Sequence, residues 1–139
     1  KRTTYPDATK EESAYDAEGR RLTSTDRASR ITTFTYHKVG RLKETTYPDL
    51  TSTKTEYDEI GRVKSVTDEL GNITLYEYDP NCGCSGRRAK IIDASGKITT
   101  FTYDENGNEK TITEADSHTT TNIYDANNRL TSVVYHDNT

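Results

Sequence analysis

A regular repeat constrains this chain more than any other feature of its sequence. Six tyrosines followed by similar residues stand at Tyr15, Tyr36, Tyr57, Tyr78, Tyr103 and Tyr124. Four of the five intervals between them are equal, and the interval from Tyr78 to Tyr103 is longer. Similarity at a fixed period, here about 21 residues, indicates that one supersecondary unit is copied along the chain. We therefore expect residues 1–139 to form a single segment of about six repeats.

A turn signal follows each of these tyrosines. Asp58 and Gly61 stand at the first and fourth positions of such a turn. Asp at the first position accepts hydrogen bonds from backbone N–H groups, and Gly at the fourth adopts dihedral angles that other residues avoid. A second signal, such as Asp68 to Gly71, begins ten residues before each tyrosine. The repeat signature comprises Tyr15, Asp16, Gly19, Tyr36, Gly40, Tyr57, Asp58, Gly61, Tyr78, Asp79, Gly86, Tyr103, Asp104, Gly107, Tyr124 and Asp125.

The glycines of these turns are expected to take positive φ, which other residues avoid. Valine should therefore cost more stability at Gly61 or Gly71 than at Ser29 or Leu50, which hold the equivalent fourth position in other turns.

The segments between the turns predict β-strands. A turn every ten or eleven residues leaves about five to seven residues for each strand, close to the usual length. Residues alternate within them: Phe34 and Tyr36 fall on one face, and Thr33 and Thr35 on the other. Period two with aromatic residues on one face favours half-exposed strands. The sequence therefore predicts an all-β fold of antiparallel β-hairpins.

Composition limits both the core and the partners. Hydrophobic residues make up 29% of the chain, against roughly 45–50% in ordinary globular domains. A single hairpin cannot be stable with so little to bury, so neighbouring repeats must supply the missing surface. The net charge of -4 gives no basic footprint for nucleic acid, and no apolar run is long enough to span a bilayer. We expect neither nucleic-acid binding nor membrane insertion.

The segment from Tyr57 to Tyr78, YDEIGRVKSVTDELGNITLYEY, resembles the YD repeats of RHS (rearrangement hot spot) proteins. This family includes bacterial polymorphic toxins, the B and C components of Tc toxins, wall-associated proteins and teneurins. The resemblance implies a curved or spiralling strip of hairpins that forms part of an open shell. The chain departs from the family pattern at His37, where Asp is usual, and at Asn128, where Gly is usual.

The resemblance also implies a function. Such a segment is a structural scaffold, part of a β-shell that encapsulates a C-terminal effector or toxin, or is displayed on the cell surface. Its partners would be the adjacent repeats of the parent chain and an encapsulated effector domain. The chain begins without Met and inside a repeat, so we expect a fragment of a larger exported protein, secreted or on the cell surface. Asp79-Pro80 lacks the motif that surrounds the family's self-cleavage site, so autoproteolysis is not expected here.

A second function remains open from the residues alone. Exposed tyrosine columns could serve an adhesion module that binds carbohydrate or protein on a cell surface. The direction of the tyrosine face distinguishes the two, because an exposed, contiguous aromatic patch favours binding and a covered one favours the scaffold.

The fourth repeat is irregular because its turn, between Asp79 and Gly86, is four residues longer and contains Cys82 and Cys84. These two residues are a candidate disulfide or redox pair. A local disulfide would be strained at this spacing, and two free thiols are the alternative. Structural zinc takes four ligands, so a metal site would need two ligands from elsewhere, and a link to another chain is a further possibility. We assign no metal site and no cofactor.

Nothing in the sequence predicts catalysis. The histidines His37, His118 and His136 lie at or beside turns without ligand spacing, and we expect them to be solvated. Carboxylate pairs such as Glu11-Glu12 lie at strand ends, where solvated charge is usual. A regular column of arginines after the turns is expected to pair with Asp and Glu across strands; it comprises Arg20, Arg41, Arg62, Arg87 and Arg129. We therefore expect no catalytic residues and no enzyme.

Overall fold

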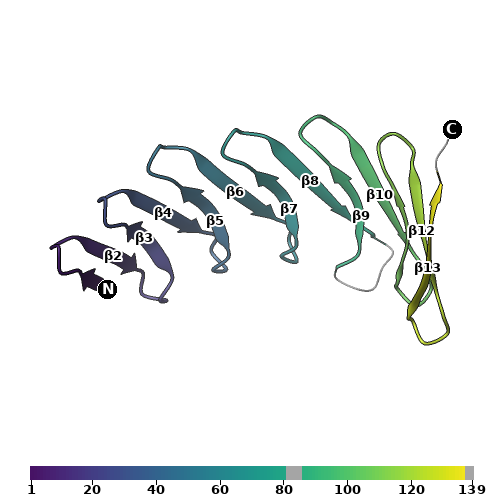
Figure 1. Cartoon of the computed structure of the whole chain (residues 1–139), viewed down its shortest axis with the longest axis horizontal. Coiled ribbons are helices and arrows are strands. Elements are labelled where there is room, and N and C mark those ends of the chain that lie inside the picture. The colour runs from purple at the N-terminus through teal and green to yellow at the C-terminus, as the bar shows by residue number, and fades with distance from the viewer. Residues whose placement is uncertain (81–85, 137–139) are drawn as a thin grey trace. The chain divides into compact units, whose positions relative to one another are not determined.

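The computed structural model describes residues 1–80 and 86–136, and within these ranges it contains strands and turns but no helix. Within residues 1–56, and again within residues 73–136, the strands lie beside their neighbours in the sequence (Figure 1). They are β1 (Arg2–Thr4), β2 (Lys10–Tyr15), β3 (Arg21–Thr25), β4 (Ile31–Tyr36), β5 (Leu42–Thr46), β6 (Ser52–Tyr57), β7 (Val63–Thr67), β8 (Ile73–Tyr78), β9 (Arg88–Ile92), β10 (Ile98–Tyr103), β11 (Glu109–Thr113), β12 (Thr119–Tyr124) and β13 (Leu130–His136).

The chain forms two compact units. The first comprises Lys1–Glu56 and Ser65–Asn72, and the second comprises Tyr57–Lys64 and Ile73–Thr139. In the first unit β1 to β6 pair antiparallel in chain order, and in the second unit β8 to β13 do the same. The predicted all-β class and its antiparallel hairpin repeat are therefore confirmed. The curvature of the strip, and its place as one segment of a larger protein, stay predictions.

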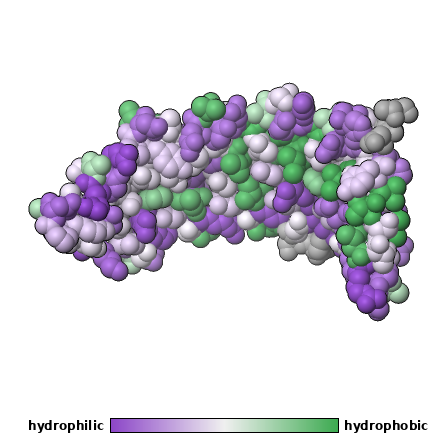
Figure 2. All heavy atoms as spheres, viewed as in Figure 1, coloured by the Kyte–Doolittle hydropathy of each residue, from purple (hydrophilic) through white to green (hydrophobic). Residues whose placement is uncertain are grey.

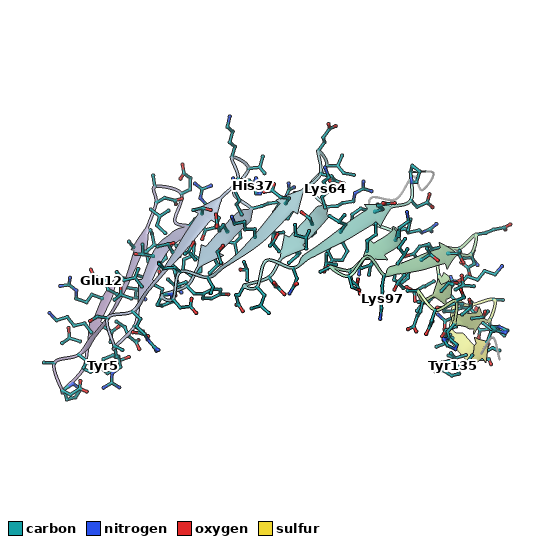
Figure 3. The ribbon with its side chains drawn as sticks, turned by 90° about the horizontal axis from the view of Figure 1, so that it is seen from above. Tyr5, Glu12, His37, Lys64, Lys97 and Tyr135 are labelled. Atoms are coloured by element: carbon teal, nitrogen blue, oxygen red, sulfur yellow. The ribbon has the colours of Figure 1, made fainter. Side chains whose placement is uncertain are left out.

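Two kinds of turn alternate along the chain. We call signature turns those that begin at Asp16, His37, Asp58, Asp104 and Asp125. We call alternate turns those that begin at Tyr5, Asp26, Tyr47, Asp68, Asp93 and Glu114. In the first unit the two kinds lie at opposite ends of the strands, as the labelled His37 of a signature turn and Tyr5 of an alternate turn show (Figure 3).

The two kinds of turn produce different strand pairing. Strands joined by a signature turn carry a bulge beside the tyrosine: Thr35 pairs with Glu44, whereas Tyr36 pairs with Leu42. A bulge adds one residue to one strand and increases the local twist. Strands joined by an alternate turn pair over three residues only, as β3 and β4 do. Such a pair is therefore open at the end where the signature tyrosine lies.

All described turns of both kinds share one backbone geometry. The N–H of the fourth residue donates to the carbonyl of the first, at 2.9 Å from Gly61 to Asp58 and 3.0 Å from Leu50 to Tyr47. The fourth residue always has positive φ, which is 91° at Gly61, 60° at Ser29 and 69° at Leu50. The expectation that glycine positions differ in this respect from Ser29 and Leu50 was wrong. Closing the turn requires the left-handed conformation whatever residue stands there.

Replacing Leu50 with glycine should therefore stabilise the protein. The left-handed conformation costs a non-glycine residue about 1–2 kcal/mol, which exceeds the entropic cost of glycine. We expect Leu50→Gly to raise the free energy of unfolding by about 0.5–1 kcal/mol in a denaturant titration. Leu70 is the matched control, because it is equally exposed (87% against 86%) but stands at the third turn position, without positive φ. Leu70→Gly should lower stability, and equal effects of the two changes would contradict this account.

The sheet faces provide no closed core. No apolar side chain is buried in the part of the chain that the structure describes, and Thr45 is the one buried residue there, at 8% exposure. The face that carries Phe34 and Tyr36 is half-buried, while Thr33 and Thr35 on the other face are exposed. Figure 2 shows apolar and polar residues interspersed over the visible surface. Stability must therefore come from contacts between neighbouring strands and turns.

Candidate functional site

The aspartate that begins a signature turn holds both ends of that turn together. Oδ1 of Asp58 accepts the backbone N–H of Arg62 at 2.8 Å, and Oδ2 accepts the guanidinium Nε of Arg62 at 2.6 Å. Asp16 accepts the same two bonds from Arg20, at 2.8 and 2.6 Å. In the turn at Asp104, Asn108 donates in place of an arginine, at 2.8 and 2.9 Å. Each aspartate therefore fixes the direction of the fifth residue's side chain.

These hydrogen bonds lower the pKa values of the aspartates. The side chain of Asn108 is the largest cause of the lowered pKa of Asp104. At Asp58 desolvation is the largest single effect and raises the pKa, but the bonds from Arg62 and its charge outweigh it, so the pKa lies below the ordinary value. The same direction holds for Asp7, Asp16, Asp26, Asp49, Asp68, Asp93, Asp116 and Asp125. These carboxylates are charged at neutral pH and serve the turns.

Acid should therefore destabilise the fold. A carboxyl group whose pKa is lower in the folded state adds stability above its unfolded pKa, near 3.8, and that stability is lost as the pH falls through the folded value. We expect the free energy of unfolding to change little between pH 7 and about 5 and to fall steeply below about 4.

The measurement is a denaturant titration at each pH, and the control is Asp58→Asn. This variant keeps an acceptor oxygen but has no charge to lose, so its stability should fall less steeply in acid than that of the parent sequence. A stability that is constant from pH 5 to about 2.5 would contradict the role of the aspartates.

The arginines that stand directly before β3, β7 and β9 reach forward to the next repeat. The guanidinium of Arg62 lies over the ring of Tyr78, 4.2 Å from its centroid. Arg20 lies over Tyr36 at 5.1 Å, and Arg87 lies over Tyr103 at 5.5 Å. The tyrosine follows the arginine at the same sequence separation in each pair. A guanidinium at these distances is attracted by the negative face of the ring.

The hydroxyl of the same tyrosine donates to the preceding repeat. Tyr78 donates to the carbonyl of Val63 at 2.9 Å, and Tyr36 donates to that of Arg21 at 2.8 Å. Tyr103 and Tyr124 make the equivalent bonds, at 2.9 and 3.0 Å. The acceptor follows the turn's fifth residue directly, so ring and hydroxyl contact adjacent residues. We call this set of contacts the Asp–Arg–Tyr link.

A glycine of the signature turn makes room for the link. A Cβ atom built on Gly107 would collide with the guanidinium of Arg87, and one built on Gly40 would lie 3.7 Å from Nη1 of Arg20. Gly107 also has a φ of 91°. At Gly107 the backbone conformation therefore favours glycine, and a larger residue would also require the Arg87 side chain to shift.

Three arginines of the predicted column pair with a carboxylate of their own turn. Arg20, Arg62 and Arg129 form ion pairs with the aspartate four residues earlier, at 2.6, 2.6 and 2.7 Å. The stacking on the next tyrosine was missed by the sequence analysis. Its signal was the constant sequence separation between arginine and tyrosine, which survives the longer fourth turn because the added residues precede Arg87.

The remaining candidates lie as follows. The expectation that His37 is solvated was wrong: its side chain is 25% exposed, and Nε2 lies 3.1 Å from the carbonyl oxygen of Thr55. His118 is exposed and lies 2.7 Å from Asp116, and His136 is exposed. In the long fourth turn, Asp79 donates its N–H to the carbonyl of Arg87 at 3.0 Å, and Gly86 is exposed. Cys82 and Cys84 lie outside the described residues, so their state stays open.

Residues 1–80 and 86–136 contain no three His, Cys, Asp or Glu side chains that are grouped as metal ligands. Over the same residues, no helix has the length and apolar character needed to cross a membrane.

The fold and the repeated link define a structural class, in which turns and half-buried tyrosines connect β-hairpin repeats into a sheet. The family model of the teneurin YD-shell matches residues 3–137, so the chain belongs to the YD-shell family. The predicted resemblance to RHS/YD-repeat proteins is thereby confirmed. None of the curated proteins compared with the chain matches it in sequence.

Solved structures with the same fold come from Tc toxins. The crystal structure of TcdB2-TccC3 without its hypervariable C-terminal region matches with a TM-score of 0.72, and the Photorhabdus luminescens Tc holotoxin pore matches with 0.71. The crystal structure of TcdB2-TccC3 also matches with 0.71. The identity in each is 23%, and the match covers 93% of this chain but 7% of the other. The chain thus spans a small part of these proteins, and the likeness shows the fold.

Proposed function

We propose that residues 1–139 form part of the wall of a β-shell and carry no catalysis. The observation that supports this most is the Asp–Arg–Tyr link combined with the absence of a buried apolar core among the described residues. Each link needs a neighbouring repeat to complete it, so the stability of the sheet increases as repeats are added. The charged aspartates accept hydrogen bonds within their own turns, so we assign them a structural role and no role in acid–base catalysis.

We further propose that the parent protein is exported and that its shell encloses a C-terminal effector domain. Membership of the YD-shell family and the likeness to Tc toxin chains support this proposal. One of those structures is described as lacking a hypervariable C-terminal region, which in the present parent would correspond to the enclosed effector. The partners of the segment would then be the adjacent repeats and that domain. Display of the same wall on the cell surface is the second form of this proposal.

The burial of the tyrosines favours the wall over an adhesion module. Among the described tyrosines only Tyr15 and Tyr135 are exposed, at 43% and 73%. These two stand on β2 and β13, in different units and far apart in the chain. The signature tyrosines of the intervening repeats are half-buried, and Tyr36, for example, contacts the guanidinium of Arg20 and the carbonyl of Arg21. Within each unit the described residues form no contiguous exposed aromatic patch, which glycan stacking requires.

Limited proteolysis of the full-length parent tests enclosure. A region C-terminal to the shell should be cleaved at least about tenfold more slowly in the native parent than when it is expressed alone, because cleavage then requires opening of the wall. Adding denaturant should remove the difference. Equal cleavage rates in the native parent and in the isolated region would contradict enclosure. Retention of the parent on cell-surface glycans, lost on Tyr15→Ala or Tyr135→Ala, would instead support the adhesion function.

A further inference from the structure

The first unit contains the same five-residue pattern twice at alternate turns. Tyr-Pro-Asp-x-Thr stands at residues 5–9 and again at residues 47–51. Oδ1 of Asp7 accepts the hydroxyl of Thr9 at 2.7 Å, and Oδ1 of Asp49 accepts that of Thr51 at the same distance. The fourth residue has positive φ in both turns. The two copies therefore present a tyrosine ring, a carboxylate and a hydroxyl in the same local geometry.

The first copy is occupied by an arginine of the chain itself. The guanidinium of Arg27 lies over the ring of Tyr5, 4.3 Å from its centroid. Its Nη2 donates to Oδ2 of Asp7 at 2.5 Å, and its Nε donates to the hydroxyl oxygen of Thr9 at 2.9 Å. One planar cation thus satisfies all three groups at once. Arginine suits such a site because its donors form a rigid fork and its plane can stack on an aromatic ring.

The second copy lacks this occupant. The residue that stands as far after Tyr47 as Arg27 stands after Tyr5 is Glu69, which cannot replace the guanidinium. The contacts that act on the Asp49 carboxylate come from Thr51 and its own backbone, whereas those on Asp7 include Arg27. In the described chain Asp49 forms no ion pair, and its Oδ2, the atom that corresponds to the Arg27 acceptor, remains available.

A groove lies where the missing guanidinium would stand. Its volume is about 680 Å³, and its lining includes Tyr47, Asp49 and Thr51 from one turn and Glu69 and Leu70 from the next alternate turn. Arg30 also borders it, but its guanidinium is paired with Asp26 at 2.8 Å. The groove therefore offers two carboxylates to a cation and, in Leu70 at 87% exposure, an apolar surface beside them.

We propose that this groove binds an arginine side chain presented by a separate partner polypeptide. The ring of Tyr47 stacks on the guanidinium, Oδ2 of Asp49 accepts one N–H, and the hydroxyl oxygen of Thr51 accepts Nε, as the first copy shows for Arg27. Glu69 supplies a second negative charge, and Leu70 contacts the apolar stem of the arginine or its neighbour in the partner.

Titration with N-acetyl-arginine amide, followed by NMR, tests the proposal. The resonances of the Tyr47 ring and the Thr51 amide should shift on addition of this probe, and the neutral isostere N-acetyl-citrulline amide should leave them unchanged. Asp49→Asn should weaken binding at least about tenfold, because a charge-assisted hydrogen bond is lost. Asp7→Asn, in the copy that Arg27 already fills, is the matched control and should leave binding at Tyr47 unchanged.

Two exchange variants sharpen the test. Glu69→Arg should fill the second copy from within, so that the Tyr47 resonances move to the bound position and the probe no longer binds there. Arg27→Ala should empty the first copy and create a second site of similar affinity, at Tyr5. Equal binding of the arginine and citrulline probes, or unchanged binding by Asp49→Asn or Glu69→Arg, would overturn the proposal. Binding by residues 1–139 but not by the full-length parent would place the arginine within the parent chain and contradict a separate partner.

Discussion

The link between an arginine of one signature turn and the tyrosine of the next repeat is the interaction on which this structure depends. Ordinary domains are stabilised by a buried apolar core, and the described part of this chain has none. In its place, Asp58 directs Arg62 onto the ring of Tyr78, whose hydroxyl bonds to Val63. The cation and the hydrogen bond together hold the ring of Tyr78 half-buried against the preceding turn. The link fixes the sequence separation between the arginine and the next tyrosine, which Arg87 and Tyr103 keep in spite of the longer fourth turn.

The sequence was sufficient for the strands and turns and insufficient for the contacts between them. Regular spacing and Asp-x-x-Gly patterns place each turn, since both are local properties of the chain. Positive φ at Ser29 and Leu50 was not predictable from residue type, because closure of the turn imposes it against local preference. The Arg62–Tyr78 contact joins residues of successive repeats, and propensity carries no information about such pairs. The contact between His37 and the carbonyl of Thr55 also joins residues far apart in the sequence, so it could not be predicted either.

The two ends of the strands differ in what they leave available. At the signature end, the guanidinium groups of Arg20 and Arg62 stack on the next tyrosine, and a side chain at Gly107 would displace that of Arg87. At the alternate end the turns vary more in sequence. Of the two Tyr-Pro-Asp-x-Thr copies, the one at residues 5–9 holds Arg27, and the one at residues 47–51 holds no arginine. Within a unit, a sheet whose signature turns are fixed can keep its architecture while its alternate turns acquire binding sites.

A double-mutant cycle on Arg62 and Tyr78 tests the central claim most directly. Arg62→Met keeps most of the apolar stem and removes the cation, and Tyr78→Leu removes the ring and its hydroxyl. If the link holds successive repeats together, the two changes are coupled by about 0.5–1 kcal/mol in the free energy of unfolding. The same cycle on Arg62 and Tyr103, whose ring is stacked by Arg87, should give no coupling beyond error. Additive effects for Arg62 and Tyr78 would contradict the account, because they would show that the repeats are held together without this contact.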